Sequence, residues 1–357
     1  MKREIEIAGC KIGTTHPPYV IAEISANHNG SLRRAKELIA RAAEAGANAV
    51  KLQTYTADTM TIRHDGPGFI VADGPWKGRH LYDVYDKAHT PWEWHPELFE
   101  TARAADITIF STPFDATAVS FLDRLGVPAF KIASFEAVDL PLIRAAAATG
   151  KPLIISTGMA SLSEIAEAVE AADAAKGRDL ALLHCVSGYP SLPRESNLRT
   201  VTDLAKKFRV VAGLSDHTLG TAVAVAAVAL GASIIEKHLT LERSEGGEDA
   251  FFSLEPAEFR KLCEESRQAW EAIGTATDEK QPSEAVHSDY RRSLYVVANV
   301  RAGESFTKNN VRAIRPGFGL APKYYDKVLR SVAKIDIPRG TPLRLDHLCA
   351  RGTRRKP

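Results

Sequence analysis

The chain has 357 residues, of which 45% are hydrophobic and 25% are charged, and its formal net charge is +2. This length suits one barrel of about 250 residues with a small second domain. The composition is that of an ordinary globular protein and excludes a disordered or fibrous one. The small net charge gives no reason to expect a nucleic acid partner, and the basic run at 351–356 is expected to be a solvated tail.

The cysteines and apolar runs bear on the cellular compartment. Cys10, Cys185, Cys263 and Cys349 lie far apart and form no C-x-x-C pair. This spacing argues against a disulfide framework or a structural zinc site, so we expect reduced thiols. No apolar run has the length of a signal peptide core or of a membrane span. The sequence therefore predicts a cytoplasmic protein with no membrane partner.

Between residues 19 and 273, short β-branched runs alternate with alanine-rich amphipathic stretches, as expected for βα units around a buried parallel sheet. The predicted strands cover residues 20–25, 49–53, 107–112, 129–134, 153–157, 180–185, 210–215 and 233–238. Residues 31–45 form the clearest helix, because its apolar positions share one face and Gly46 follows at the position of a C-terminal cap. Eight such units close most simply into an α/β fold of the (β/α)8 TIM barrel type.

The connection at residues 54–94 is too long for an ordinary βα connection and carries Tyr, Trp and His with several glycines. Loops of this length in a compact domain are usually functional or disordered. Because this one leaves from the catalytic face of the barrel, we expect it to cover a substrate. A disordered insertion is the alternative.

The composition becomes polar after Gly274, as in a linker. We therefore predict a barrel domain at 1–280, a linker at 281–290 and a second domain at 291–357. This second domain is expected to contain a strand at 293–300, several turns, and little helix except near 323–329.

Each predicted barrel strand carries a charged or hydrogen-bonding residue at its C-terminal end. These residues include Glu23, Ser25, Lys51, Gln53, Ser111, Thr112, Lys131, Ser134, Ser156, Thr157, His184, Ser187, Ser215, Asp216, His217, Glu236, Lys237 and His238. A barrel gathers all eight ends around one opening, where the active sites of this fold are built. One such residue alone could be a cap or an ion-pair partner, but eight in parallel predict a catalytic mouth.

Two lysines, Lys51 and Lys131, stand inside apolar strands, where an ammonium group must find an anionic partner or lose its charge. Ser134, Ser156 and Ser215 supply hydroxyl groups at neighbouring strand ends. The natural ligand for such a set is a phosphate or a carboxylate.

Other interpretations of these residues stay open. The lysines could form internal ion pairs, such as Lys51 with Glu23 or Lys237 with Glu236. Lys131 could instead form a Schiff base, as lysines of class I aldolases do. A non-enzymatic alternative takes the C-terminal domain as an ice- or ligand-binding module, although its small size and lack of a flat Thr-rich face argue against this.

A pair of histidines predicts a metal site. His217 and His238 end the seventh and eighth strands, near Asp216, Glu236 and Asp249. Two imidazoles at neighbouring strand ends suit a divalent cation with open positions for water and substrate. Mixed nitrogen and oxygen ligands fit Mn²⁺ or Mg²⁺ better than a thiolate-rich zinc site. A structural, hydrogen-bonded role is the alternative for each histidine.

Ten short motifs in chain order carry a family resemblance. They read IAEISANHNGS, AVKLQTYTADTM, IFSTPFD, FKIASFE, PLIISTGMAS, LLHCVSGYP, GLSDHTLG, IIEKHLT, RRSLYVV and IRPGFG. In number, order and spacing they are highly specific, and along nearly the whole chain the sequence resembles the sialic acid synthase family. SANHN, LQTYTADTM and HTPWEWH at 89–95 resemble its pseudaminic acid synthase branch more than the N-acetylneuraminate or legionaminate branches.

The resemblance implies a fold and a reaction. The fold is a TIM barrel followed by an antifreeze-like (SAF) domain, which in this family reaches over the partner's active site in a domain-swapped homodimer. The reaction is a C–C bond-forming transfer. Phosphoenolpyruvate condenses with the open-chain aldehyde of an N-acetylated amino sugar, water adds at C2 and phosphate leaves. In the pseudaminate branch the sugar is 2,4-diacetamido-2,4,6-trideoxy-L-altrose.

The resemblance also implies roles for individual residues. Phosphoenolpyruvate would be held by Lys51, Thr112, Lys131, Ser134, Ser156 and Ser215. The metal would be bound by His217 and His238, and Glu23 would be the general acid/base. The sugar would be contacted by Gln53, Tyr189, Glu236, Asp249 and, from the other subunit, Arg315. Ser187 is also expected at the substrate, but relatives that make sialic acid usually have asparagine there, which weakens an assignment to N-acetylmannosamine.

Overall fold

The computed structural model describes residues 4–74, 76–175 and 179–351. It divides into two compact units, residues 1–274 and 275–357, and each is described here by itself. The limits predicted for the linker, 281–290, and for the domains beside it stay a prediction.

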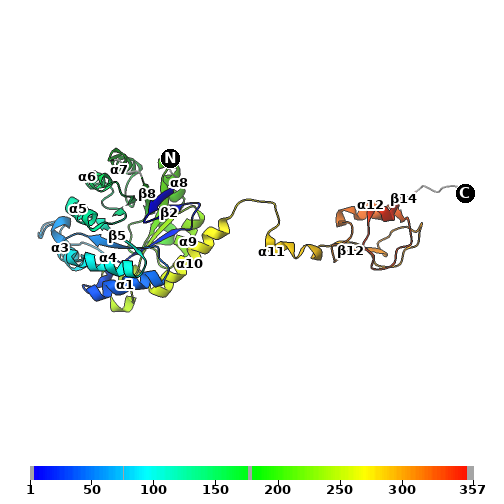
Figure 1. Cartoon of the computed structure of the whole chain (residues 1–357), viewed down its shortest axis with the longest axis horizontal. Coiled ribbons are helices and arrows are strands. Elements are labelled where there is room, and N and C mark those ends of the chain that lie inside the picture. The colour runs from blue at the N-terminus through cyan, green and yellow to red at the C-terminus, as the bar shows by residue number, and fades with distance from the viewer. Residues whose placement is uncertain (1–3, 75, 176–178, 352–357) are drawn as a thin grey trace. The chain divides into compact units, whose positions relative to one another are not determined.

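A closed barrel of eight parallel strands forms the centre of the first unit (Figure 1). The strands are β3 (Tyr19–Glu23), β4 (Ala49–Thr54), β5 (Thr108–Pro113), β6 (Phe130–Ile132), β7 (Leu153–Ser156), β8 (Leu180–Cys185), β9 (Val211–Asp216) and β10 (Ile234–His238). Each strand pairs with the next one along the chain, and β10 closes the barrel against β3. The predicted (β/α)8 TIM barrel is confirmed.

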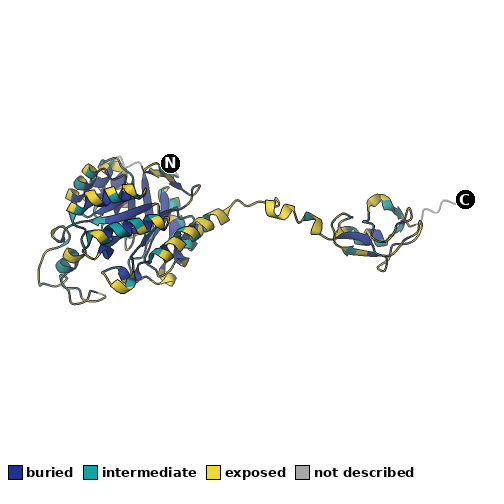
Figure 2. Ribbon diagram, turned by 60° about the horizontal axis from the view of Figure 1, so that its bottom comes forward, coloured by how far each residue is buried: buried dark blue, intermediate teal, exposed yellow. Residues whose placement is uncertain are grey.

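Helices surround this barrel. They are α1 (Leu32–Glu44), α4 (His95–Ala104), α5 (Ala116–Leu125), α6 (Leu140–Ala148), α7 (Leu162–Ala174), α8 (Arg199–Phe208), α9 (Ala222–Ala229) and α10 (Pro256–Ile273). Helix α1 begins after Ser31, whose side chain caps Arg34 N, and ends before Gly46, which has a φ of +86°. Figure 2 shows their buried faces against the strands and their exposed faces outward, which is the pattern that the amphipathic spacing predicts.

An antiparallel hairpin closes the N-terminal end of the barrel, and the sequence patterns did not predict it. Its strands are β1 (Glu4–Ile7) and β2 (Cys10–Gly13). Ile5, Ile7 and Ile12 are buried in one cluster with inward-facing barrel residues such as Tyr19 and Phe110. The interior is therefore filled with apolar side chains at this end, and the polar strand ends lie at the other.

The loops at the polar end begin earlier than predicted. The first strand was expected to reach residue 25, but β3 ends at Glu23, and Ser25 has a φ of +39°. The reason is local, because Ser25 N donates to Glu23 Oε1 at 2.6 Å and turns the chain. Short 3-10 helices follow several strands: η1 (Ser25–His28), η3 (Pro193–Glu195), η4 (Arg243–Glu245) and η5 (Ala250–Phe252).

The long connection at 54–94 contains regular structure in its described residues. It includes α2 (Ala57–Met60), α3 (Leu81–Ala88) and η2 (Trp92–Trp94), with an isolated bridge between Ile70 and His80. These elements do not fit the alternative of a disordered insertion. A role in covering the substrate stays a prediction.

The second unit is small and rich in turns. Its elements are α11 (Pro282–Ala285), η6 (Ser288–Tyr290), β11 (Ser293–Val296), β12 (Val311–Ile314), η7 (Pro322–Tyr324), α12 (Tyr325–Leu329), β13 (Ser331–Ala333), η8 (Leu345–His347) and β14 (Leu348–Ala350). Leu294, Phe306, Val328 and Leu343 belong to its core. The expected helical turn near 323–329 is present, and the expected strand at 293–300 is shorter.

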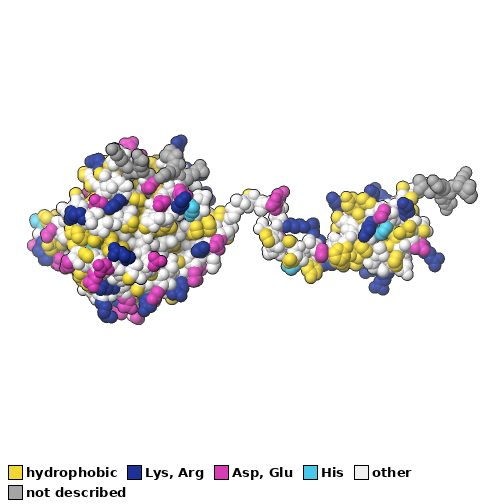
Figure 3. Space-filling view, viewed as in Figure 1, with side chains coloured by type: hydrophobic (Ala, Val, Ile, Leu, Met, Phe, Trp, Pro, Cys, Tyr) yellow, Lys and Arg dark blue, Asp and Glu magenta, His cyan; other side chains and the backbone are white. Residues whose placement is uncertain are grey.

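Basic and acidic side chains are interspersed on the face in Figure 3. Cys10, Cys185 and Cys263 form no disulfide with any described residue. Among the residues that the structure describes, no helix combines the length and the apolar character needed to cross a bilayer.

The hairpin plug yields a stability prediction. Ile12→Ala should lower the free energy of unfolding of the barrel by about 2–5 kcal/mol, because it leaves a cavity at a fully buried site. Trp76, Trp92, Trp94 and Trp270 all belong to the first unit, so tryptophan fluorescence during urea unfolding reports on the barrel alone. Lys11→Ala, at an exposed position of the same hairpin, should change stability by about 0.5 kcal/mol or less. Equal losses of unfolding free energy in the two variants would contradict the role of the hairpin in closing the barrel.

Candidate active site

Strand register brings the predicted polar residues together at one end of the barrel. In the sheet, Glu23 on β3 lies opposite Lys51 on β4 and His238 on β10. Glu236 on β10 lies opposite Ser215 on β9. Because side chains alternate between the two faces of a strand, these groups all face the interior near the C-terminal opening. The predicted convergence of lysines, carboxylates and histidines is therefore present.

Four charged side chains form a buried cluster in this opening. Lys51 Nζ is ion-paired with Glu23 Oε2 and lies 3.6 Å from Glu236 Oε1. Lys131 Nζ lies 3.8 Å from the same oxygen of Glu236. None of the four residues is more than 5% exposed. One carboxylate thus stands between two ammonium groups, and a second carboxylate holds one of them from the other side.

Hydroxyl groups surround the two ammonium groups. Lys51 Nζ donates to Thr112 Oγ1 at 3.0 Å, and Lys131 Nζ donates to Ser156 Oγ at 2.6 Å. Ser215 Oγ donates to Glu236 Oε1 at 3.4 Å. Next to them, Ser134 Oγ accepts from Gly158 N at 3.1 Å. These hydroxyl groups lie close to the lysines and, together with the ammonium groups, can donate hydrogen bonds to the oxygens of an anion.

Burial shifts the pKa values of these groups in different directions. It raises the pKa of Glu23 to about 7, even though Lys51 stands beside it. For Glu236, burial is outweighed by Lys131 and Lys51, which leave its pKa below the usual value. Burial lowers the pKa of Lys131, whereas Glu23 and Glu236 overcome burial and raise the pKa of Lys51. Of the two carboxyl groups in this cluster, Glu23 is therefore the one that can gain and lose a proton near neutral pH.

The two predicted metal ligands are neighbours. The ring centroids of His217 and His238 are 5.5 Å apart. Burial and the nearby cations hold the pKa of His238 well below its usual value, so its ring is neutral and able to bind a metal. His217 Nδ1 contacts Val186 O at 3.0 Å, which orients its ring.

Unpaired polar atoms test whether a cation fits here. His238 Nδ1 and Glu236 Oε2 are buried, and neither has a hydrogen-bond partner among the described residues. Asp249 Oδ2 lies 3.9 Å from His238 Nδ1. Within the described part of the chain, no three His, Cys, Asp or Glu side chains are gathered closely enough to hold a metal by themselves. The residues fit a cation held by two imidazoles, with its other positions open to oxygen ligands.

Of the residues expected at the sugar, Glu236 belongs to the buried cluster and Arg315 to the second unit, and the others lie around the opening. The ring of Tyr189 is 4.5 Å from that of His217, and Ser187 Oγ is 4.0 Å from Cys185 Sγ. Gln53 lies opposite Thr112 in the ladder and is partly buried. Arg315 belongs to the second unit, where it is exposed directly after β12.

One alternative pairing is wrong and one is present. Lys237 does not pair with Glu236, because adjacent residues of a strand point to opposite faces. Its ammonium group instead contacts Asp216 Oδ2 at 2.5 Å and Thr218 O at 2.6 Å, behind the barrel wall. The internal pair of Lys51 with Glu23 is present, within the cluster described above.

The sequence reasoning missed two carboxylates near the opening. Burial raises the pKa of Glu136 to about 7, and its Oε2 has no hydrogen-bond partner among the described residues. Glu248 precedes Asp249 and receives hydrogen bonds from the 54–94 connection. Glu136 could have been found in the FKIASFE motif, two residues after Ser134. Glu248 carried no separate signal.

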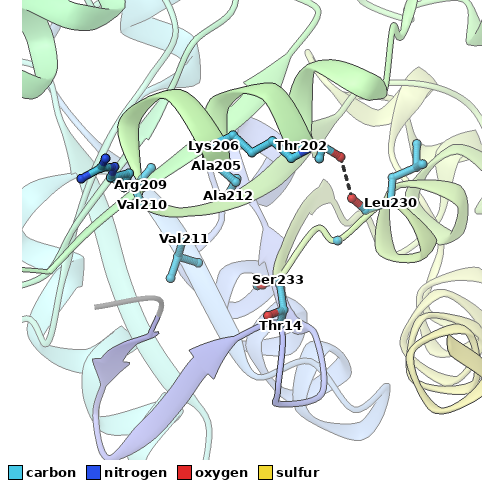
Figure 4. Close-up of a pocket in the computed structure, with 11 residues that line it drawn as sticks. Thr14, Thr202, Ala205, Lys206, Arg209, Val210, Val211, Ala212, Leu230 and Ser233 are labelled. Atoms are coloured by element: carbon cyan, nitrogen blue, oxygen red, sulfur yellow. Dashed lines mark hydrogen bonds between the residues drawn. The ribbon is translucent and has the colours of Figure 1, made fainter. Parts of the chain in front are cut away.

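A cavity of about 570 Å³ lies away from this chemistry, at the N-terminal end of the barrel (Figure 4). Its lining includes Thr14, Lys206, Arg209, Val211 and Ser233. None of the predicted site residues lines it. The candidate active site is therefore assigned by the convergence of charged groups rather than by the size of a hollow.

Comparison with known proteins agrees with this architecture. Residues 38–278 match the NeuB family, and residues 291–348 match the SAF domain. The chain belongs to the NeuB family. The predicted membership in the sialic acid synthase family, with an SAF domain after the barrel, is confirmed.

Individual relatives of this NeuB family chain differ in the sugar acid that they are named for. It is 42% identical to a pseudaminic acid synthase of Helicobacter pylori over 93% of this chain and 98% of that protein. It is 35% identical to an N,N'-diacetyllegionaminic acid synthase of Legionella pneumophila over 94% of this chain and 96% of that protein. A crystal structure of N-acetylneuraminic acid synthetase from Leptospira borgpetersenii, in complex with citrate, has 35% identity and a TM-score of 0.72, covering 81% of this chain and 96% of that one.

The position of Glu236 close to both Lys51 and Lys131 can be tested by measuring protein stability. Glu236→Gln should lower the free energy of unfolding by about 3 kcal/mol, because Lys131 then loses the carboxylate nearest to its buried ammonium group. Glu97→Gln removes a carboxylate from a half-exposed pair with Lys36 and should cost less than about 1 kcal/mol. Urea unfolding followed by tryptophan fluorescence measures both. Similar small losses would show that the cluster does not depend on Glu236.

Proposed function

We propose that this NeuB family chain is a pseudaminic acid synthase, which condenses phosphoenolpyruvate with 2,4-diacetamido-2,4,6-trideoxy-L-altrose to give pseudaminic acid and phosphate. The observation that carries the proposal is the pairing of two buried ammonium groups with two neighbouring histidines at one barrel opening. The two ammonium groups can hold an enol phosphate. The two histidines can hold a cation that binds the carbonyl group with which the enol carbon reacts. The identities of 42% and 43% with pseudaminic acid synthases, against 35% and 36% with legionaminic acid synthases, favour this sugar.

Phosphoenolpyruvate binding falls to the lysines and hydroxyl groups. Lys51 and Lys131 supply positive charge to its phosphate and carboxylate. Hydrogen bonds from Thr112, Ser156 and Ser215 fix its orientation, with Ser134 beside them. In the free protein Glu236 lies within 4 Å of both ammonium groups, so the bound anion shares these cations with it. This arrangement keeps the enol carbon pointed at the opening where the sugar enters.

The carbonyl carbon of the sugar is the electrophile in this reaction. His217 and His238 would hold a divalent cation, Mn²⁺ or Mg²⁺, which polarises the aldehyde oxygen when bound. Tyr189, Gln53, Ser187 and Asp249 would orient the sugar on the rim. Lys131 keeps hydrogen bonds to Ser156 Oγ and Ile132 O, so its ammonium group has positioned partners. This favours anion binding over the Schiff-base aldolase alternative.

Glu23 would move the proton. Its carboxyl group lies at the same level of the barrel as Lys51 and His238, and its pKa of about 7 allows both protonation states near neutral pH. As the enol carbon bonds to the aldehyde carbon, the aldehyde oxygen takes up a proton and becomes a hydroxyl group, while C2 becomes electron-deficient and takes up water. A carboxylate at Glu23 can accept the proton that this water loses, and phosphate then leaves from C2.

The assembly and the compartment are part of the same proposal. In a domain-swapped homodimer, Arg315 of one chain would contact the sugar bound by the other, since a guanidinium fork can anchor an acetamido oxygen. Arg315 stands between two exposed apolar residues, Ile314 and Phe318, which are 37% and 60% exposed. The protein is further proposed to act in the cytoplasm.

The proposed reaction can be tested by product analysis. We expect a product with the mass of pseudaminic acid and release of one phosphate when the protein is given phosphoenolpyruvate, Mn²⁺ and the trideoxy altrose sugar. The candidate sugars of N-acetylneuraminate and legionaminate synthases should react more slowly. His238→Ala and thorough chelation should each abolish turnover, whereas His16→Ala, at the opposite end of the barrel, should not. Full activity after chelation would reject the metal-dependent reaction.

The pH dependence tests the role of Glu23. Because a base must be deprotonated, kcat/KM for the sugar at saturating phosphoenolpyruvate should rise as pH passes about 7. Glu23→Gln should lower kcat by about 10²–10⁴-fold and remove that rising limb. If the variant keeps a limb at the same pH, another group is the base.

A further inference from the structure

Glu248 connects two segments on opposite sides of β3. It lies in the loop after β10, and its partners lie in residues 76–88, here called the strap, which runs from Trp76 to the end of α3. Trp76 Nε1 donates to Glu248 Oε2 at 2.7 Å, and Arg79 Nη1 donates to both carboxylate oxygens at 2.9 Å. Lys87 Nζ lies 2.9 Å from Oε1. The strap belongs to the connection that follows β4, and β3 lies between β4 and β10 in the barrel.

These contacts differ from an ordinary surface ion pair. Both oxygens of Glu248 are engaged, and its side chain is 11% exposed, whereas Arg79 and Lys87 are 36% and 68% exposed. Burial acts to raise the pKa of Glu248, but hydrogen bonds from Lys87 and Arg79 lower it, so the group stays charged. Charge-assisted hydrogen bonds to a shielded carboxylate are stronger than exposed pairs. The carboxylate therefore fastens the strap at one point.

On the barrel side, Glu248 is joined directly to the active site by the backbone. The next residue, Asp249, accepts a hydrogen bond from Ser25 Oγ at 2.5 Å and lies 3.9 Å from His238 Nδ1. A peptide unit held at Glu248 restricts the backbone of Asp249. The residue that holds the strap, Glu248, is thus the direct chain neighbour of Asp249, which lies on the rim of the opening.

On the strap side, α3 supports an aromatic residue at the opening. Tyr85 packs edge-on against Tyr55, with ring centroids 5.8 Å apart, and Tyr55 packs against Phe114 at 5.1 Å. Tyr55 is 3% exposed and follows Gln53 by two residues. Loss of the strap's position would remove one of the two rings that hold Tyr55.

We infer that Glu248 is a positioning residue that fastens the strap across the end of β3 and thereby holds Asp249 and Tyr55 in place for the amino sugar. This inference rests on the proposed function only for the identity of the sugar. It requires that the strap loosens when the carboxylate is lost and that the sugar, rather than phosphoenolpyruvate, binds less well.

The matched test compares Glu248→Gln with Glu245→Gln. Glutamine keeps the size and removes the charge, and Glu245 lies in the same loop but is paired with Arg34 of α1 instead of the strap. For Glu248→Gln we expect KM for the sugar to rise about tenfold, with kcat and KM for phosphoenolpyruvate nearly unchanged. Amide hydrogen exchange in residues 76–88 should become faster. Glu245→Gln should leave both quantities at the wild-type values.

A second variant separates this role from a general loss of folding. Arg79→Met removes the more exposed partner of the same contact. It should raise KM for the sugar and speed amide exchange in the strap, but less than Glu248→Gln does. The double variant with Glu248→Gln should be no worse than Glu248→Gln alone, since both remove one interaction. Additive losses would overturn the inference, as would unchanged exchange in the strap. A wild-type protein that makes no sugar acid would reject the proposed function, while exchange would still decide the role of Glu248.

Discussion

The structure depends on two ammonium groups and two carboxylates that share one buried space. Glu236 lies within 4 Å of both Lys51 and Lys131, and Glu23 holds Lys51 from the other side. Removing four charges from water is costly unless each finds a partner at short range. The fold must therefore keep the ends of β3, β4, β6 and β10 at fixed spacing, and an anion that enters this space meets lysines that are already desolvated and positioned.

The barrel supplies this spacing from both faces of its strands. The inward residues carry the charges, while outward neighbours form a second layer of contacts behind them. Thr54 Oγ1 lies 2.7 Å from both His95 Nε2 and Ser111 Oγ, so β4, β5 and the start of α4 are joined at one hydroxyl. Burial lowers the pKa of His95 to about 4, which keeps its ring neutral in this contact. A similar role behind β9 and β10 falls to the buried pair of Lys237 and Asp216.

How far the sequence predicts this arrangement depends on the range of each interaction. The convergence of Lys51, Lys131 and the two histidines follows from two periodicities, the alternation along a strand and the parallel βα repeat, and both are visible in the residues. The partner of Lys237 was misjudged because proximity in sequence places Glu236 on the opposite face. The hairpin under the barrel and the contacts of Glu248 could not be predicted, because they join segments whose approach is fixed only by the closed sheet.

The charge balance of the cluster explains why its two carboxyl groups need different pKa values. With both ionised, two carboxylates and two ammonium groups sum to zero, and a substrate that brings a phosphate and a carboxylate would add uncompensated negative charge to a buried site. Burial raises the pKa of Glu23 to about 7, whereas the two lysines lower that of Glu236. Glu23 can thus change its charge near neutral pH, while Glu236 stays charged beside both lysines. The carboxyl group best suited to accept the proton of water is therefore the one that is paired with a single lysine.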